Sequence, residues 1–255
     1  VEFPEDGYHG EDITELAKEY FDKYGNDLYE IDPETRKQKL VDFALPKNIA
    51  KMKSDLEKYR ITYDNWFYES SLHKSGQVKE TIDILKEKGM TYEKDGALWF
   101  KTTDLGLDKD EVLLRANGFP TYFAVDIAYH RNKFIVRGFD KCIDVWGADH
   151  HGHVARMKSS MSALGVDPSK LDVVLMQLVK LVRNGEIVKM SKRTGKAIQL
   201  ADLLDEVPVN AARFYFNLRE SNSQMDFDLD LAVKEDAQNP VYYVQYAHAR
   251  ICSIV

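Results

Sequence analysis

The sequence CIDVWGADHHGH, residues 142–153, decides the fold class. Residues 142–146 are mostly apolar and predict a strand, and a turn over 147–152 follows with a glycine at each end. A helix over 153–164 then ends before Gly165. Another strand is expected around 172–182, and strands that alternate with helices are typical of α/β proteins with a parallel sheet. Ligands of such sheets bind at the carboxyl ends of the strands, so the turn is a candidate site.

Residues 11–58, upstream of this unit, have the three- and four-residue apolar spacing of helices. Pro33 and Pro46 are expected to divide them into about three short helices, because proline interrupts helical hydrogen bonding.

The remaining sequence predicts a small α/β unit and further helices. The expected elements are a strand over 61–68, a helix over 77–88, strands over 97–102 and 111–115, a turn at 117–118, a helix over 121–133, helix and loop over 199–232, and a helix that starts at Pro240 and continues to the end of the chain.

The composition is that of a globular protein. Of 255 residues, 44% are hydrophobic and 11% aromatic, and 42 acidic residues outnumber 35 basic ones, which gives a net charge of −7. This balance excludes a uniformly basic nucleic-acid-binding surface. Cys142 and Cys252 match neither a disulfide framework nor a metal motif, which suits a cytoplasmic protein. No apolar run reaches the roughly 18 residues of a membrane span. Because the chain lacks an initial Met, we expect a fragment.

A basic cluster, VKMSKRTGK, occupies residues 188–196 directly after an apolar strand. Its lysines and arginine, with the hydroxyl of Ser191, suit a polyphosphate. The cluster is not the phosphate-binding loop of nucleotide hydrolases, because Ala197 stands where that loop has Ser or Thr. The alternative interpretation is an exposed basic hairpin tip.

The turn contains His150, His151 and His153. A metal site would explain them, but histidines without a carboxylate pattern such as H-E-x-x-H form a weak ligand set, and we predict no protein-bound metal. The alternative is that one or two of them cap the turn.

Tyr122 and Asp126 stand four residues apart on the helix that Thr121 can cap, so they share one face. A carboxylate beside a phenol can hold a cationic ligand, and a guanidinium has a planar set of donors for it. The alternative is an ordinary surface aspartate near a helix start.

These segments together resemble the arginyl-tRNA synthetases of bacterial type, which are class I aminoacyl-tRNA synthetases. Residues 188–196 are similar to the KMSKR signature loop of class I, and residues 121–153 are similar to the arginine enzymes. Residues 239–250 are similar to the start of their helical anticodon-binding domain. His150 to His153 also fit the pattern H-x-G-H of the other class I signature, but their surroundings match the second half of the catalytic fold. The true signature is therefore expected upstream of Val1.

The resemblance implies an α/β fold that is the second half of a Rossmann-type nucleotide-binding catalytic domain, with an inserted small α/β unit and helical flanks. The expected segments are a helical segment (1–58), the inserted unit (59–120), the catalytic half with the KMSKR loop (121–204), a helical connector (205–234) and the start of the anticodon-binding domain (235–255).

The implied function is ATP-dependent attachment of L-arginine to tRNA(Arg) through an arginyl-adenylate. The enzyme would be an arginine–tRNA ligase, cytoplasmic and monomeric, with Mg²⁺ arriving on ATP as substrate. We expect the 255 residues alone to be inactive.

The resemblance also assigns roles to single residues. It implies catalytic roles for Lys189, Ser191 and Lys192, arginine contacts for Tyr122, Asp126 and His150, and ATP contacts for Gly147, Asp149, His153, Val188, Lys189, Met190 and Lys192.

Two other functions stay open from the sequence. One is a compact nucleotidyltransferase of the H-x-G-H type, with His150 and His153 on ATP and Lys192 on the pyrophosphate. The other is a non-catalytic fragment that contacts RNA.

Overall fold

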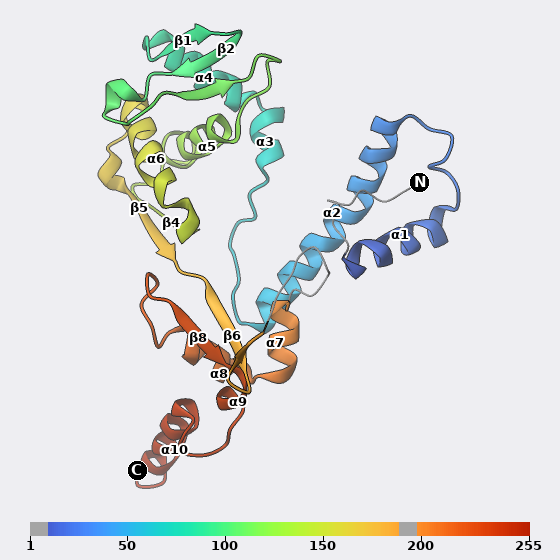
Figure 1. Ribbon diagram of the computed structural model, residues 1–255, viewed down its shortest axis with the longest axis vertical. Coiled ribbons are helices and arrows are strands. Elements are labelled where there is room, and N and C mark those ends of the chain that lie inside the picture. The colour runs from blue at the N-terminus through green and yellow to red at the C-terminus, as the bar shows by residue number, and fades with distance from the viewer. Residues whose placement is uncertain (1–9, 189–197) are drawn as a thin grey trace. The chain divides into compact units, whose positions relative to one another are not determined.

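The computed structural model describes residues 10–188 and 198–255, which form two compact units. The turn unit contains residues 65–178 and 221–224. The loop unit contains the chain up to Asp64, residues 179–220 and residues 225–255. Figure 1 labels the elements of both units. The predicted segments 59–120 and 121–204 are each divided between the two units.

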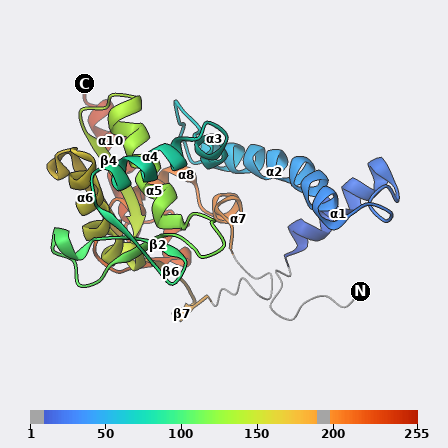
Figure 2. The ribbon, with the colours of Figure 1, turned by 90° about the horizontal axis from the view of Figure 1, so that it is seen from above.

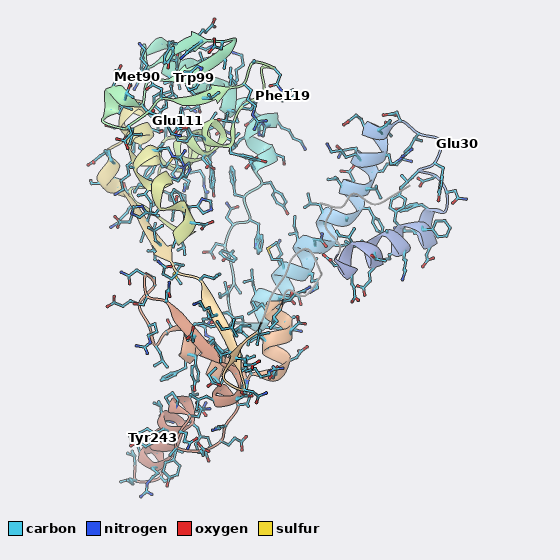
Figure 3. The ribbon with its side chains drawn as sticks, in the orientation of Figure 1. Glu30, Met90, Trp99, Glu111, Phe119 and Tyr243 are labelled. Carbon is cyan, nitrogen blue, oxygen red and sulfur yellow. The ribbon has the colours of Figure 1, made fainter. Side chains whose placement is uncertain are left out.

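The turn unit starts with two helices and an antiparallel sheet. Its first elements are α3 (Glu69–Lys74), α4 (Gln77–Glu87), β1 (Thr91–Lys94), β2 (Ala97–Phe100) and β3 (Glu111–Leu114). The sheet order is β1-β2-β3, and Figure 3 labels Trp99 on this sheet. The indole of Trp99 stacks on Tyr92 with ring centroids 6.4 Å apart. Helix α4 and strands β2 and β3 confirm the predicted helix over 77–88 and the predicted strands over 97–102 and 111–115. β1 was not predicted, and no strand forms over 61–68, where one was expected.

The second half of the turn unit is the predicted strand–helix–strand unit. Its elements are α5 (Tyr122–Arg131), the π-helical turn η2 (Asn132–Val136), β4 (Cys142–Gly147), α6 (His151–Leu164) and β5 (Leu171–Met176), with short 3-10 turns at Thr103–Leu105, Ala148–His150 and Pro168–Lys170. β4 and β5 are parallel, with Cys142 opposite Leu171. The prediction of a single strand over 172–182 is wrong, because two strands form there. β5 ends at Met176, and β6 (Val179–Arg183) belongs to the other unit.

One hydrophobic core holds the turn unit together. Phe100, Leu113, Ile127, Met157 and Leu171 are completely buried in it. These residues come from β2, β3, α5, α6 and β5, so both halves of the unit share this core. Figure 1 and Figure 2 show α5 and α6 beside β4. The core therefore fixes α5 and α6, which carry the candidate site.

The loop unit has a helical part and a small sheet. Its elements are α1 (Glu11–Tyr24), α2 (Pro33–Lys58), β6, β7 (Glu186–Ile187), α7 (Leu200–Glu206), α8 (Val209–Phe216), β8 (Met225–Asp228), α9 (Leu229–Ala232) and α10 (Pro240–Cys252). β6 pairs with β7 antiparallel and with β8 parallel. β8 lies in a region where only helix and loop were expected. α10 starts as predicted but ends at Cys252 instead of continuing to the last residue.

Pro46 does not end a helix, which corrects the prediction of about three short helices over 11–58. α2 runs through it from Pro33 to Lys58. Pro33 begins α2 as predicted, because proline fits the first helical turn and Asp32 accepts a hydrogen bond from the Thr35 amide at 3.0 Å. Within the two described ranges, no helix is both long and apolar enough to cross a membrane.

Candidate functional site

Helix α5 begins where the sequence predicts, because Thr121 caps it. The hydroxyl of Thr121 accepts a hydrogen bond from the Ala124 amide at 3.3 Å and donates one to the Val112 carbonyl at 2.7 Å. The first bond satisfies a free amide of the helix start, and the second ties that start to β3. The position of Asp126 on this helix is thus fixed by neighbouring structure.

Asp126 has a partner on α6. Its Oδ2 lies 3.0 Å from Nε2 of His153, and its side chain is 44% exposed. The side chain of His153 is only 13% exposed, and its ring packs against Trp146 and Phe123, with centroid distances of 5.3 Å and 5.7 Å. These rings hold the imidazole so that Nε2 faces the carboxylate. The Asp126 carboxylate is therefore both oriented and accessible to solvent.

Tyr122 lies one turn before Asp126 on α5 and is 80% exposed. Its phenol does not pack into the protein as a core residue would, so it is available to a ligand.

The turn after β4 presents polar side chains to solvent. The side chains of Asp149 and His150 are 83% and 60% exposed, and His150 Nε2 lies 3.8 Å from Asp149 Oδ2. A Cβ atom on Gly147 would lie 2.5 Å from Oδ1 of Asp149. Glycine at 147 therefore lets the Asp149 carboxylate fold back over the turn.

The predicted ATP contacts lie only in part within the described residues. Val188 is half-buried, and its amide donates to the Leu181 carbonyl at 2.9 Å, which closes the hairpin before the basic cluster. The predicted residues Lys189, Met190, Ser191 and Lys192 lie outside the described residues.

The three histidines of the turn do not form a ligand set with one another or with acids. In residues 10–188 and 198–255, no group of three or more His, Cys, Asp or Glu side chains is placed to hold a metal ion. His153 faces Asp126, and His150 faces Asp149.

A second His–Asp pair is more deeply buried than the first and was not predicted. His130 Nε2 lies 2.6 Å from Asp144 Oδ2, and Lys133 Nζ lies 2.6 Å from the other oxygen, Oδ1. Burial acts to raise the pKa of Asp144, but the hydrogen bonds and charges of His130 and Lys133 outweigh it, and the pKa lies below its ordinary value. A signal was present in the sequence, because Asp144 interrupts the otherwise apolar strand over 142–146.

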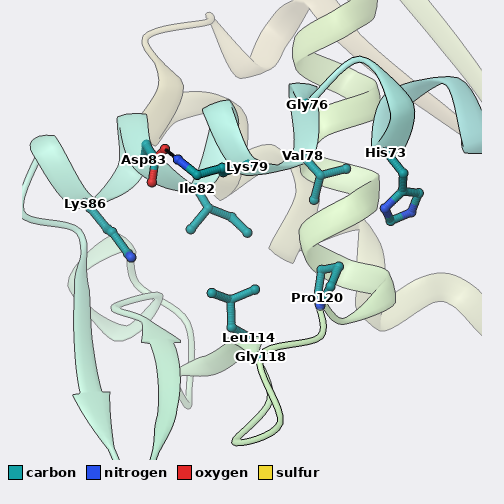
Figure 4. Close-up of a pocket in the computed structure, with 10 residues that line it drawn as sticks. All are labelled: His73, Gly76, Val78, Lys79, Ile82, Asp83, Lys86, Leu114, Gly118 and Pro120. Atoms are coloured by element: carbon teal, nitrogen blue, oxygen red, sulfur yellow. Dashed lines mark hydrogen bonds and ion pairs between the residues drawn. The ribbon is translucent and has the colours of Figure 1, made fainter.

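A separate cavity of about 310 Å³ lies between α4 and residues 114–120 (Figure 4). Val78 and Ile82 of α4 line this cavity, together with Leu114 and Pro120. None of the predicted site residues line this cavity, so it is not the arginine site that the sequence predicts.

Comparison with known proteins decides the family. Residues 4–252 match the family described as class I tRNA synthetases (R), catalytic domain. The chain belongs to this family. It has the mixed α/β structure of the class I arginyl-tRNA synthetase catalytic domains. This membership supports the synthetase interpretation and not a compact nucleotidyltransferase.

Relatives and solved structures agree on the family. The arginine–tRNA ligase of Acetivibrio thermocellus is 61% identical over 255 residues, which are all of this chain and 45% of that protein. The arginine–tRNA ligase of Ruminiclostridium cellulolyticum is 63% identical over 254 residues, again 45% of its length. A Campylobacter jejuni crystal structure assigned to the arginyl-tRNA synthetases has a TM-score of 0.89 and 40% identity, and the match covers all of this chain and 55% of that one. The chain therefore spans about half the length of the curated relatives it matches.

Proposed function

We propose that the full-length protein attaches L-arginine to tRNA(Arg), using ATP and forming an arginyl-adenylate. The family match over residues 4–252 carries this proposal. Arginine–tRNA ligases that are 61% and 63% identical to the chain support it. Cytoplasmic location and a monomeric state are part of the same proposal.

Asp126 is proposed to bind the arginine side chain. A guanidinium presents parallel N–H donors that a carboxylate can accept as a pair, and the Asp126 carboxylate is accessible for this. His153 holds Oδ2 from one side, which restricts the direction from which a guanidinium can approach. Tyr122 and His150 are the further proposed contacts, and both are exposed on the same unit.

The chemical steps need no covalent enzyme intermediate. The arginine carboxylate oxygen attacks the α-phosphorus of ATP, a new C–O–P linkage forms, the bond to the β-phosphate breaks, and pyrophosphate leaves. A ribose hydroxyl of tRNA then attacks the adenylate carbonyl, and AMP leaves. The protein contributes positioning and charge stabilisation to both steps.

Residue roles for ATP follow from the family resemblance. We propose that Lys189 and Lys192 bind the triphosphate and stabilise the leaving pyrophosphate, with Ser191 as a hydrogen-bond donor. Val188 and Met190, which neighbour these residues in the sequence, would contact the nucleotide of ATP. Gly147, Asp149 and His153 are the proposed contacts on the turn unit. Mg²⁺ would bind as part of the ATP substrate.

The domain assignment is proposed on the same basis. Residues 121–204 would be the second half of a Rossmann-type catalytic domain, 59–120 its inserted unit and 235–255 the start of the anticodon-binding domain. Residues 1–58 and 205–234 would be the helical flanks.

The test is arginine-dependent catalysis by the full-length protein. We expect transfer of labelled arginine to tRNA, and ATP–pyrophosphate exchange that depends on arginine when tRNA is present. Lys192→Ala should reduce exchange about a hundredfold, because it removes a cation from the leaving group. Exchange that is independent of arginine, or that another acceptor supports, would contradict the proposal.

A further inference from the structure

His130 links the candidate arginine site to strand β4. Its Nδ1 lies 2.8 Å from the backbone carbonyl oxygen of Asp126, one turn earlier on α5, and its Nε2 lies 2.6 Å from Oδ2 of Asp144. The residue is 3% exposed. A single side chain thus connects the backbone of the arginine-binding residue to an acid of the sheet.

The chemistry of these contacts places the hydrogens. A carbonyl oxygen only accepts hydrogen bonds, so the Nδ1 of His130 must carry the hydrogen that it shares with Asp126. Nδ1 thus donates to the Asp126 carbonyl, and Nε2 lies against Oδ2 of Asp144 and 3.3 Å from Nζ of Lys133.

Neutralising Asp144 does not require this histidine. Lys133 already pairs with Oδ1 of Asp144 at 2.6 Å, and its ammonium also lies 4.8 Å from the ring centre of Tyr129. An apolar side chain at 130 would avoid the cost of burying a further polar ring. The bond to the Asp126 carbonyl is what a histidine adds here.

The aromatic packing carries the same link to α6. Trp146 of β4 lies edge-on to His130, with ring centroids 6.3 Å apart, and also contacts His153, at 5.3 Å. Both histidines that bind Asp126, one at its carbonyl and one at its carboxylate, therefore pack on the same indole.

We propose that His130, bound to Asp144, is a positioning residue that sets the place of Asp126 for arginine. It acts through the helix backbone and does not itself touch the substrate. The inference rests on the proposed function, because it assigns Asp126 to the guanidinium.

Two amide substitutions in the full-length protein separate its two bonds. Asparagine places an amide nitrogen near the position of Nδ1, and glutamine places one near Nε2. His130→Gln should keep the bond to Asp144 and lose the bond to the Asp126 carbonyl. His130→Asn should do the reverse, so each variant is the control for the other.

The readout is the arginine KM in tRNA-dependent pyrophosphate exchange. We expect His130→Gln to raise it about tenfold, with the ATP KM unchanged, and His130→Asn to leave it within about threefold of wild type. Equal arginine KM values for the two variants would overturn the proposal, because a role only in folding or charge balance makes no such distinction.

NMR of the wild-type protein with ¹⁵N-labelled histidine is independent of variant folding and of catalysis. We expect His130 to show a hydrogen on Nδ1, and saturating arginine to shift that resonance while the exposed His73 resonance stays in place. A bare Nδ1, or a His130 signal that bound arginine leaves unmoved, would overturn the proposal.

The other titratable groups near this network are Tyr129, Cys142 and Arg137.

Failure of the proposed function is distinguishable from failure of this inference. If calorimetry shows that wild type does not bind arginine, the proposed function fails and the positioning role fails with it. If wild type binds arginine and the His130 variants behave alike, the positioning role alone is overturned.

Discussion

Nε2 of His153 lies 3.0 Å from Oδ2 of Asp126, so the first turn of α6 and the middle of α5 meet at one carboxylate. One turn later on α5, His130 pairs with Asp144 of β4 at 2.6 Å. These two His–Asp pairs join both helices and the strand around the proposed arginine site. The outer pair is partly exposed and the inner pair is buried, which suits a binding pair supported by a structural one.

Asp126→Asn should raise the arginine KM steeply and leave the ATP KM nearly unchanged. An amide cannot accept two charge-assisted bonds from a guanidinium, and the loss in a dry pocket is roughly 2–5 kcal/mol. Steady-state exchange kinetics of the full-length enzyme measure it. Asp172→Asn on β5, which lies in an exposed pair with Lys141, is the control. An arginine KM within a few-fold of wild type would mean that Asp126 does not bind the guanidinium.

His153→Asn tests which substrate His153 serves, because asparagine places its amide near Nδ1 and leaves Asp126 without the contact from Nε2. The family resemblance predicts an ATP contact, whereas the structure places its Nε2 on Asp126. If its main role is to orient that carboxylate, the arginine KM should rise about tenfold and the ATP KM should change little. A larger change in the ATP KM than in the arginine KM would support the ATP contact instead.

Much of the fold was predictable, because it depends on local pattern. The parallel pair of β4 and β5 and the helices around it follow from apolar periodicity and from glycines at the turns. β1 was missed although a signal existed: Asp95 and Gly96 have φ values of 52° and 74°, the geometry of a tight hairpin turn. The strand expected over 61–68 is absent. Phe67 packs on Tyr129 with ring centroids 4.6 Å apart, but Tyr63 and Tyr68 are exposed, and β-forming residues without a neighbouring strand form no ladder.

The site was predictable only in part. The helical spacing correctly placed Tyr122 and Asp126 on α5, and Thr121 caps that helix as expected. Neither the His153–Asp126 contact nor the His130–Asp144 pair follows from spacing, because each joins elements that only tertiary packing brings together. The interpretation of the turn histidines as isolated caps could not include such partners.

Pro46→Ala should stabilise α2. Pro46 is exposed inside a 26-residue helix, where proline removes one backbone hydrogen bond and costs about 3 kcal/mol relative to alanine. Hydrogen exchange of peptides around residue 46 should slow in the full-length variant. Pro33→Ala is the matched control, because proline at the first position of the same helix interrupts no bond and its loss should not slow exchange. Unchanged exchange around residue 46 would show that the surrounding structure already compensates for the missing bond.

The Asp144 network should make stability depend on pH in the acid range. Burial tends to raise the pKa of this carboxyl, but the hydrogen bonds and charges of His130 and Lys133 lower the pKa by more than burial raises it. The folded-state pKa therefore lies below the unfolded value of about 3.9. A group of this kind stabilises the folded state fully above the unfolded pKa, and the contribution is lost as the pH falls through the folded pKa. Wild type should therefore lose stability as the pH falls below about 4.

Asp144→Asn should remove that dependence. At pH 7 it leaves the buried ammonium of Lys133 without its carboxylate, and we expect a loss of about 3–5 kcal/mol. Urea denaturation followed by tryptophan fluorescence measures the loss, because Trp146 packs on His130. The difference between wild type and variant should narrow as the pH is lowered from 7 to 3, whereas the exposed Asp172→Asn control should stay close to wild type throughout. A difference that is constant over this range would contradict the assignment of the charge to Asp144.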